Sequence, residues 1–96
     1  LGLTLTPDSR RLDFGDMSLT LSKKEASLLE FFLKNPGQTL PRPRILSYVW
    51  GLSSEVEEGN LDNYIYFLRR RLKSLDAPVK LTTVHGIGYR LEEKGQ

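Results

Sequence analysis

The 96-residue sequence has no cysteine, one histidine and no apolar run of the length that crosses a membrane. Without cysteine the chain forms neither disulfides nor thiolate metal sites, which fits a cytoplasmic protein. A single histidine, with no phosphate-binding loop, nucleophile elbow or metal-ligand spacing, favours a protein that is not an enzyme and carries no metal and no cofactor. We also expect no membrane partner, since no segment reaches about 18 consecutive apolar residues.

The beginning of the chain lacks targeting features. Leu1-Gly2-Leu3-Thr4 has neither a basic segment nor a long apolar stretch, so no signal peptide is expected. It also lacks an initiator methionine, which leads us to expect a fragment of a longer protein. A hydrophobic fraction of 39% suffices for one modest core, so we predict a single domain over residues 1–96.

The charges are unevenly distributed, although the net charge is only +2. Three glutamates are the charged residues between positions 51 and 59, whereas the segment 60–75 has four basic residues against one aspartate. An acidic segment therefore directly precedes a basic one. Taken alone, this pattern fits a nucleic-acid surface and ordinary solvated charge equally well.

The first 21 residues have the pattern of short strands. Apolar and polar residues largely alternate, which is the period of a half-buried strand; the apolar ones are Leu3, Leu5, Leu12, Phe14, Met17, Leu19 and Leu21. Turn-forming residues separate them at Pro7-Asp8-Ser9 and Gly15-Asp16. Residues 1–21 are therefore predicted to form a small N-terminal antiparallel sheet.

Three helices are predicted over residues 22–75. Ser22 and Glu25 have the spacing of a capping box, and the helix they begin should end near Lys34, before Asn35-Pro36-Gly37. A shorter helix is expected from about Pro41 to Trp50, with Gly51 after it. The third, over residues 60–75, has one apolar stripe, formed by Leu61, Ile65, Leu68, Leu72 and Leu75.

The opposite face of this third helix is left for solvent or a ligand. It contains Gly59, Asn63, Tyr66, Phe67 and Arg70. Residues 79–91 then predict a β-hairpin that turns at His85-Gly86-Ile87-Gly88, where the two glycines are expected to permit a tight turn. Three helices followed by such a wing predict an α+β winged helix-turn-helix fold, in which a helix enters the major groove of DNA.

The ordered set of short motifs resembles the C-terminal effector domain of OmpR/PhoB-type response regulators over nearly the whole chain. The matching segments are Leu21-Ser22-Lys23-Lys24-Glu25, Leu28-Leu29, Asn35-Pro36-Gly37, Arg42 with Ile45-Leu46, Val49-Trp50-Gly51, Leu61-Asp62, Ile65, Leu68-Arg69-Arg70-Arg71-Leu72, and Thr83 to Leu91. The resemblance implies sequence-specific binding of double-stranded DNA in transcription control. It also implies an N-terminal receiver domain, absent from this chain, and a cognate histidine kinase.

The resemblance further implies which residues contact DNA. On the third helix, positions that match base or phosphate contacts of the family are Asn60, Tyr64, Tyr66, Phe67 and Arg69, and positions outside it that match backbone contacts are Arg42, Trp50, Thr83 and Tyr89. To these we add Asn63 and Arg70 from the outward face and His85 at the wing turn. Cationic and hydrogen-bonding side chains of these types neutralise phosphates and fix the register of a protein on DNA.

Several of these residues have a structural interpretation as well. Trp50 and Tyr89 are equally typical of core aromatics. The three consecutive arginines 69–71 cannot all face DNA, because successive helical residues differ by about 100° in direction, so at least one should be solvated or paired with an acid. Asp62 lies away from the middle of the outward face, and we predict a structural pairing role for it.

Two positions depart from the family pattern. Phe67 stands where the family often has a basic residue; it cannot donate a hydrogen bond, but it can contact a thymine methyl, or else pack on the core or on a protein. His85 stands where an arginine often enters the minor groove, and it is mostly neutral at pH 7. The acidic segment 51–59 corresponds to a loop that can contact RNA polymerase in the family, with a solvated connector as the alternative.

The main alternative to a DNA-binding regulator is a protein-interaction module, which the adjacent Tyr66 and Phe67 motivate. The arginines and the family pattern favour DNA. With one recognition helix and no recognisable dimerisation element, the chain is expected to bind as a monomer to each of two tandem half-sites, about one helical turn apart.

Overall fold

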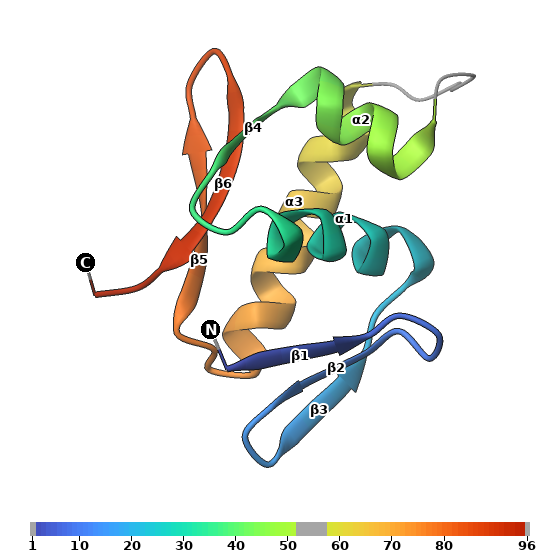
Figure 1. Ribbon diagram of the computed structural model, residues 1–96, viewed down its shortest axis with the longest axis vertical. Coiled ribbons are helices and arrows are strands. Elements are labelled where there is room, and N and C mark those ends of the chain that lie inside the picture. The colour runs from blue at the N-terminus through green and yellow to red at the C-terminus, as the bar shows by residue number, and fades with distance from the viewer. Residues whose placement is uncertain (1, 52–57, 96) are drawn as a thin grey trace.

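Two three-stranded antiparallel sheets pack against three helices (Figure 1). The computed structural model describes residues 2–51 and 58–95, without the side chains of residues 58–60. The elements, in order, are β1 (Leu3–Thr6), β2 (Arg11–Phe14), β3 (Met17–Thr20), α1 (Lys23–Lys34), β4 (Thr39–Pro41), α2 (Arg42–Trp50), α3 (Glu58–Ser74), β5 (Val79–Val84) and β6 (Gly88–Glu93). This is the predicted winged-helix order, with one strand added.

The N-terminal sheet is the predicted meander, in the order β1-β2-β3. Its register pairs Leu5 with Leu12 and Leu12 with Leu19, so these leucines share one face. Leu12, on the central strand, is fully buried against the helices. Alternation of apolar and polar residues thus orients the sheet toward the core.

The start of α1 confirms the predicted capping box. The Ser22 hydroxyl accepts a hydrogen bond from the Glu25 backbone N–H at 3.2 Å, and the Glu25 carboxylate accepts one from the Ser22 backbone N–H at 2.8 Å. Two of the N–H groups that lack a helical partner are thereby satisfied. Helix α2 begins at Arg42, after Pro41, and has a second proline in its first turn, where a missing N–H is tolerated.

The strand β4 was not predicted. It pairs with β6, so the C-terminal sheet has the order β4-β6-β5 and the wing is the outer part of a three-stranded sheet. The prediction for Gly86 is confirmed, since it lies in the turn with φ of 79°. Gly88 serves a different purpose from the one predicted. A Cβ added there would lie 1.9 Å from the Leu40 carbonyl oxygen, so glycine is needed for the close approach of β4 to β6.

The core lies between the inner stripe of α3, helix α1 and the two sheets. All five residues of the predicted α3 stripe are buried, with exposures of 3% or less. They pack in one cluster with the α1 residues Leu28, Leu29 and Phe32. Since the stripe faces inward, the residues on its opposite side are directed outward. Among the described residues, none of the helices combines the length and the apolar character that a bilayer crossing needs.

Candidate nucleic-acid interface

The outer face of α3 is exposed as predicted. Asn63 and Arg70 are exposed, and the two aromatic side chains between them retain 56% (Tyr66) and 44% (Phe67) of their accessible surface. These four residues, which we call the α3 outer face, occupy positions i, i+3, i+4 and i+7 and so share one face of the helix. Phe67 is not part of the core, so its predicted alternative of packing there does not hold.

Aromatic side chains extend this surface toward α2. The Trp50 ring meets the Tyr64 ring edge-on at 5.5 Å between centroids, and Tyr64 in turn meets Phe67 at 6.0 Å. Phe67 also contacts Tyr66, at 5.9 Å. Edge-to-face pairs of this kind restrict both rings, because the positive edge of one prefers the negative face of the other. Phe67 is therefore held from two sides although it is exposed.

Trp50 and Tyr64 have a structural role in addition to the predicted one. Both are half-buried and pack against the core cluster. The ammonium group of Lys24 lies 5.8 Å from the Trp50 ring centroid, and Lys24 also donates to the Val49 carbonyl at 3.3 Å. Sequence reasoning missed Lys24, because a lysine in a capping segment has no local signal for a partner on α2.

A groove of about 550 Å³ lies between the start of α1 and the C-terminal half of α3. Its α3 side includes Tyr64, Phe67 and Arg70, and its α1 side includes Ser22 and Glu25. The groove is thus continuous with the α3 outer face. Arg70 lies at this border with its guanidinium 5.9 Å from the Tyr66 ring centroid, a cation–π distance.

The predicted pairing role of Asp62 is confirmed. Arg42 donates to its carboxylate at 2.8 Å and 3.5 Å, and the Tyr89 hydroxyl donates to the same carboxylate. The hydrogen bond from Arg42, followed by that from Tyr89, holds the pKa of Asp62 below its usual range. Burial, followed by the hydrogen bond to Asp62, raises the pKa of Tyr89. The same carboxylate raises the pKa of Arg42.

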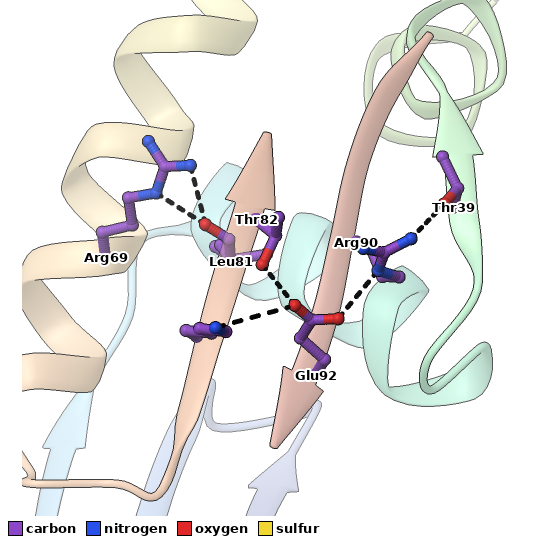
Figure 2. A network of polar contacts seen from close by, with 7 residues as sticks. Thr39, Arg69, Leu81, Thr82, Arg90 and Glu92 are labelled. Carbon is purple, nitrogen blue, oxygen red and sulfur yellow. Dashed lines mark hydrogen bonds and ion pairs between the residues drawn. The ribbon is translucent and has the colours of Figure 1, made fainter. Parts of the chain in front are cut away.

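Arg69 reaches from α3 to the wing (Figure 2). Its Nε and Nη2 donate to the Leu81 carbonyl at 3.0 Å and 2.7 Å, and Nη2 also donates to the Thr83 hydroxyl at 3.0 Å. Arg71 points the other way and pairs with Glu25 at 3.4 Å. The prediction that at least one of the three arginines is solvated or paired with an acid is confirmed by Arg71.

The remaining predicted residues lie around the wing turn. Thr83 and His85 are exposed, and a hollow of about 310 Å³ between the turn and α3 includes both, together with Arg42 and Asp62. Ile87, which was not predicted, is 50% exposed in the same turn. Tyr89 is only 6% exposed, so its ring is a core aromatic while its hydroxyl faces Asp62.

The structure thus places the predicted DNA contacts that it describes in two groups, one along α3 and its neighbour Trp50 and one around the wing. Asn60 is in the first turn of α3, where side chains lie outside the described part, as does most of the acidic segment 51–59. A family model described as "Transcriptional regulatory protein, C terminal" matches residues 16–91. The chain belongs to this family, the DNA-binding domains of OmpR/PhoB-type response regulators.

Two regulators are similar in sequence to this OmpR/PhoB-type domain. The transcriptional regulatory protein DltR of Streptococcus agalactiae is 39% identical over 92 residues, which is 96% of this chain and 41% of DltR. The response regulator MprA of a Mycobacterium species is 39% identical over 93 residues, 97% of this chain and 40% of MprA. The chain therefore spans about two fifths of the length of these relatives.

Solved structures share the fold of this OmpR/PhoB-type domain. The DNA-binding domain of Escherichia coli CadC superposes with a TM-score of 0.84 at 32% identity, over 94% of this chain and 85% of that one. The DNA-binding domain of Klebsiella pneumoniae RstA, solved in complex with the RstA box, superposes with a TM-score of 0.78 at 25% identity. The match covers 95% of this chain and 91% of the RstA domain. The winged-helix α+β class predicted from sequence is confirmed.

Proposed function

We propose that this domain binds double-stranded DNA sequence-specifically, as the output part of a two-component response regulator that controls transcription in the cytoplasm. The observation that carries the proposal is the α3 outer face, where one amide, two aromatic rings and one guanidinium are exposed together on one face of the helix. Within the described residues, the side chains that pair with acids or with β5 lie off this face.

The length of the α3 outer face suits a short base sequence. From Asn63 to Arg70 the helix rises by about 10 Å at 1.5 Å per residue. Base pairs follow at about 3.4 Å, so the face spans about three base-pair steps. An asparagine can pair with adenine, a phenyl ring can cover a thymine methyl and an arginine can pair with guanine or a phosphate. Three of the four exposed side chains, those of Asn63, Phe67 and Arg70, thus have a chemically suitable partner on DNA.

Residues beside the α3 outer face would fix the domain on the DNA backbone. Trp50 and Tyr64 flank the outer face at its α2 side, and Thr83 and His85 flank it at the wing. Hydroxyl, indole and imidazole donors suit phosphate oxygens. In this proposal one domain occupies one half-site as a monomer, and two copies occupy tandem half-sites about one helical turn apart.

The partners of the full-length protein follow from the family. We infer an N-terminal receiver domain and a cognate histidine kinase, because the chain spans two fifths of relatives that are regulators. The contact with RNA polymerase through residues 51–59 stays a prediction, since residues 52–57 lie outside the described structure.

Selection of bound sequences from a random DNA pool, followed by a salt titration of the selected site, tests the proposed function. A DNA-binding domain should enrich a short motif and lose affinity steeply with salt, because phosphate contacts release counterions. An enriched motif that occurs twice, one helical turn apart, would support tandem binding. Failure to enrich any motif, with salt-independent binding to a protein partner, would instead favour the interaction module. Sedimentation without DNA should give a monomer, and a tight dimer would contradict monomeric half-site binding.

A further inference from the structure

Tyr89 on β6 lies between two arginines that come from different helices. The guanidinium carbons of Arg42 on α2 and Arg69 on α3 are each 5.9 Å from the centroid of the Tyr89 ring. The Tyr89 hydroxyl is bound at the same time to Asp62, also on α3, and accepts from Arg42 at 3.4 Å. One buried aromatic side chain of the wing is thus contacted by charged groups from both helices.

The two arginines also hold the backbone around the wing. Arg69 binds the carbonyl of Leu81 through two nitrogens, on β5, which is an edge strand of the described sheet. The backbone N–H of Arg42 donates to the Ile87 carbonyl in the wing turn, at 2.9 Å. The wing is therefore attached to α3 along one strand and to the start of α2 at its turn. We call Arg42, Asp62, Arg69 and Tyr89 the wing clamp.

The outer surface of the same sheet is braced as well (Figure 2). Glu92 accepts from Thr82 at 2.7 Å and from Arg90 at 2.8 Å, and Arg90 donates on to Thr39 at 3.1 Å. This row of contacts joins β5, β6 and β4 side by side. Because these contacts join the three strands, an orientation imposed on Tyr89 and Leu81 is expected to be passed to the whole hairpin.

We propose that the wing clamp consists of positioning residues, which set the orientation of the wing relative to the recognition helix before DNA is bound. In this view the main task of Arg69 is to hold β5, rather than to neutralise a phosphate as the sequence suggested. The proposal rests on the proposed DNA binding, because the orientation matters where α3 and the wing contact one duplex. A preoriented wing avoids the ordering cost that a mobile hairpin would meet on binding.

The chemistry of arginine makes the two roles of Arg69 separable. Three hydrogen bonds to two acceptors on β5 need the planar fork of a guanidinium, whereas a lysine keeps the charge and loses the fork. Arg69→Lys should therefore preserve a phosphate contact and break the clamp. Arg70→Lys is the matched control, because Arg70 is the next residue on the helix, is exposed and lies on the α3 outer face.

Affinity is measured on two duplexes with the same selected site, one with flanking base pairs under the wing and one truncated before them. Arg69→Lys and Arg69→Ala should both bind the flanked duplex about tenfold more weakly than the native domain, as expected for the loss of charge-assisted hydrogen bonds. Both should bind the truncated duplex with nearly native affinity. Neither should change the salt slope on the truncated duplex. Arg70→Ala should reduce the steepness of the salt dependence by about one on both duplexes, whereas Arg70→Lys should retain the native salt dependence.

The proposal is overturned if Arg69→Lys binds like the native protein while Arg69→Ala lowers the salt slope on both duplexes, the behaviour of a phosphate contact. Tyr89→Phe, which removes only the hydroxyl, should also weaken binding to the flanked duplex alone. Equal losses on both duplexes would contradict a role through the wing.

Amide hydrogen exchange of the free domain gives a readout that does not need DNA. Arg69→Lys and Tyr89→Phe should accelerate exchange in β5 and β6 more than in α1, and unchanged exchange in the hairpin would also overturn the proposal. If the native domain binds no DNA at all, the proposed function fails, and the exchange measurement still decides whether the clamp holds the wing.

Discussion

The exposed ring of Phe67 leads to a prediction that separates shape recognition from charge. We expect Phe67 to contribute to sequence preference by covering the C5-methyl group of a thymine. Its neighbours Tyr64 and Tyr66 meet it edge-on at 6.0 Å and 5.9 Å, so the ring is held in an outward position. A restrained apolar group on the α3 outer face discriminates between bases better than a mobile one, since less freedom is lost on contact.

The magnitude follows from the exposed area. Phe67 retains 44% of its accessible surface, and a free phenylalanine exposes about 200 Å², so about 90 Å² is available for contact. If a methyl group and the ring together bury about 40 Å², the gain is about 1 kcal/mol at 25 cal/mol per Å². That energy corresponds to about a fivefold change in affinity.

The assay replaces thymine by uracil across the selected site, which removes the methyl groups and keeps the base-pair hydrogen bonds. The native domain should lose about fivefold in affinity. Phe67→Leu should lose part of that factor, and Phe67→Ala should lose much less. The unfolding free energy of Phe67→Ala should fall by only about 1 kcal/mol, because the residue is outside the core and loses ring contacts with Tyr64 and Tyr66. Equal losses for native protein and Phe67→Ala would refute the reasoning.

Three further predictions concern the elements that support the interface. Gly88→Ala should destabilise the domain by about 3 kcal/mol in urea denaturation, because the new Cβ would meet the Leu40 carbonyl of β4. Ser22→Ala should cost about 1 kcal/mol in the same assay through loss of the α1 cap. The hydrogen bond from Arg42 lowers the pKa of Asp62 in the folded domain, so the ionised carboxylate stabilises the fold. Because the pair is half-exposed, this stabilisation is below about 1 kcal/mol. It is complete above the pKa of Asp62 in the unfolded chain, about 3.9. It should disappear as the pH falls through the folded pKa, so denaturation curves of the native domain and Asp62→Asn should converge at low pH.

The first two of these have controls on exposed residues. Ile87→Ala, in the turn next to Gly88, should leave stability nearly unchanged, as should Ser18→Ala on β3. A Gly88→Ala protein as stable as Ile87→Ala would contradict the close approach of β4 to β6. A stability difference between native protein and Asp62→Asn that grows at low pH would contradict the sign of the Asp62 effect.

Local patterns in the sequence determined most of the helices and the wing. The capping box at Ser22 and Glu25 depends on groups three residues apart, and the α3 stripe depends on the 3.6-residue period, so both are readable without tertiary information. The same period identified the exposed face of α3 and placed Asp62 away from its middle. The ordered motifs then indicated the family that the comparisons show.

Long-range contacts were decided only by the tertiary structure. The strand β4 has three residues, too few for a period, and it forms because β6 offers it a backbone partner 49 residues away, from Leu40 to Tyr89. Arg69 binds a backbone carbonyl of Leu81, and every residue has such a carbonyl, so no side-chain pattern marks this partner. Gly88 was expected in the turn for its conformational freedom, whereas space beside Leu40 is the reason for it. Residue types and their periods act within one element, but which groups of different elements meet is decided by how those elements pack.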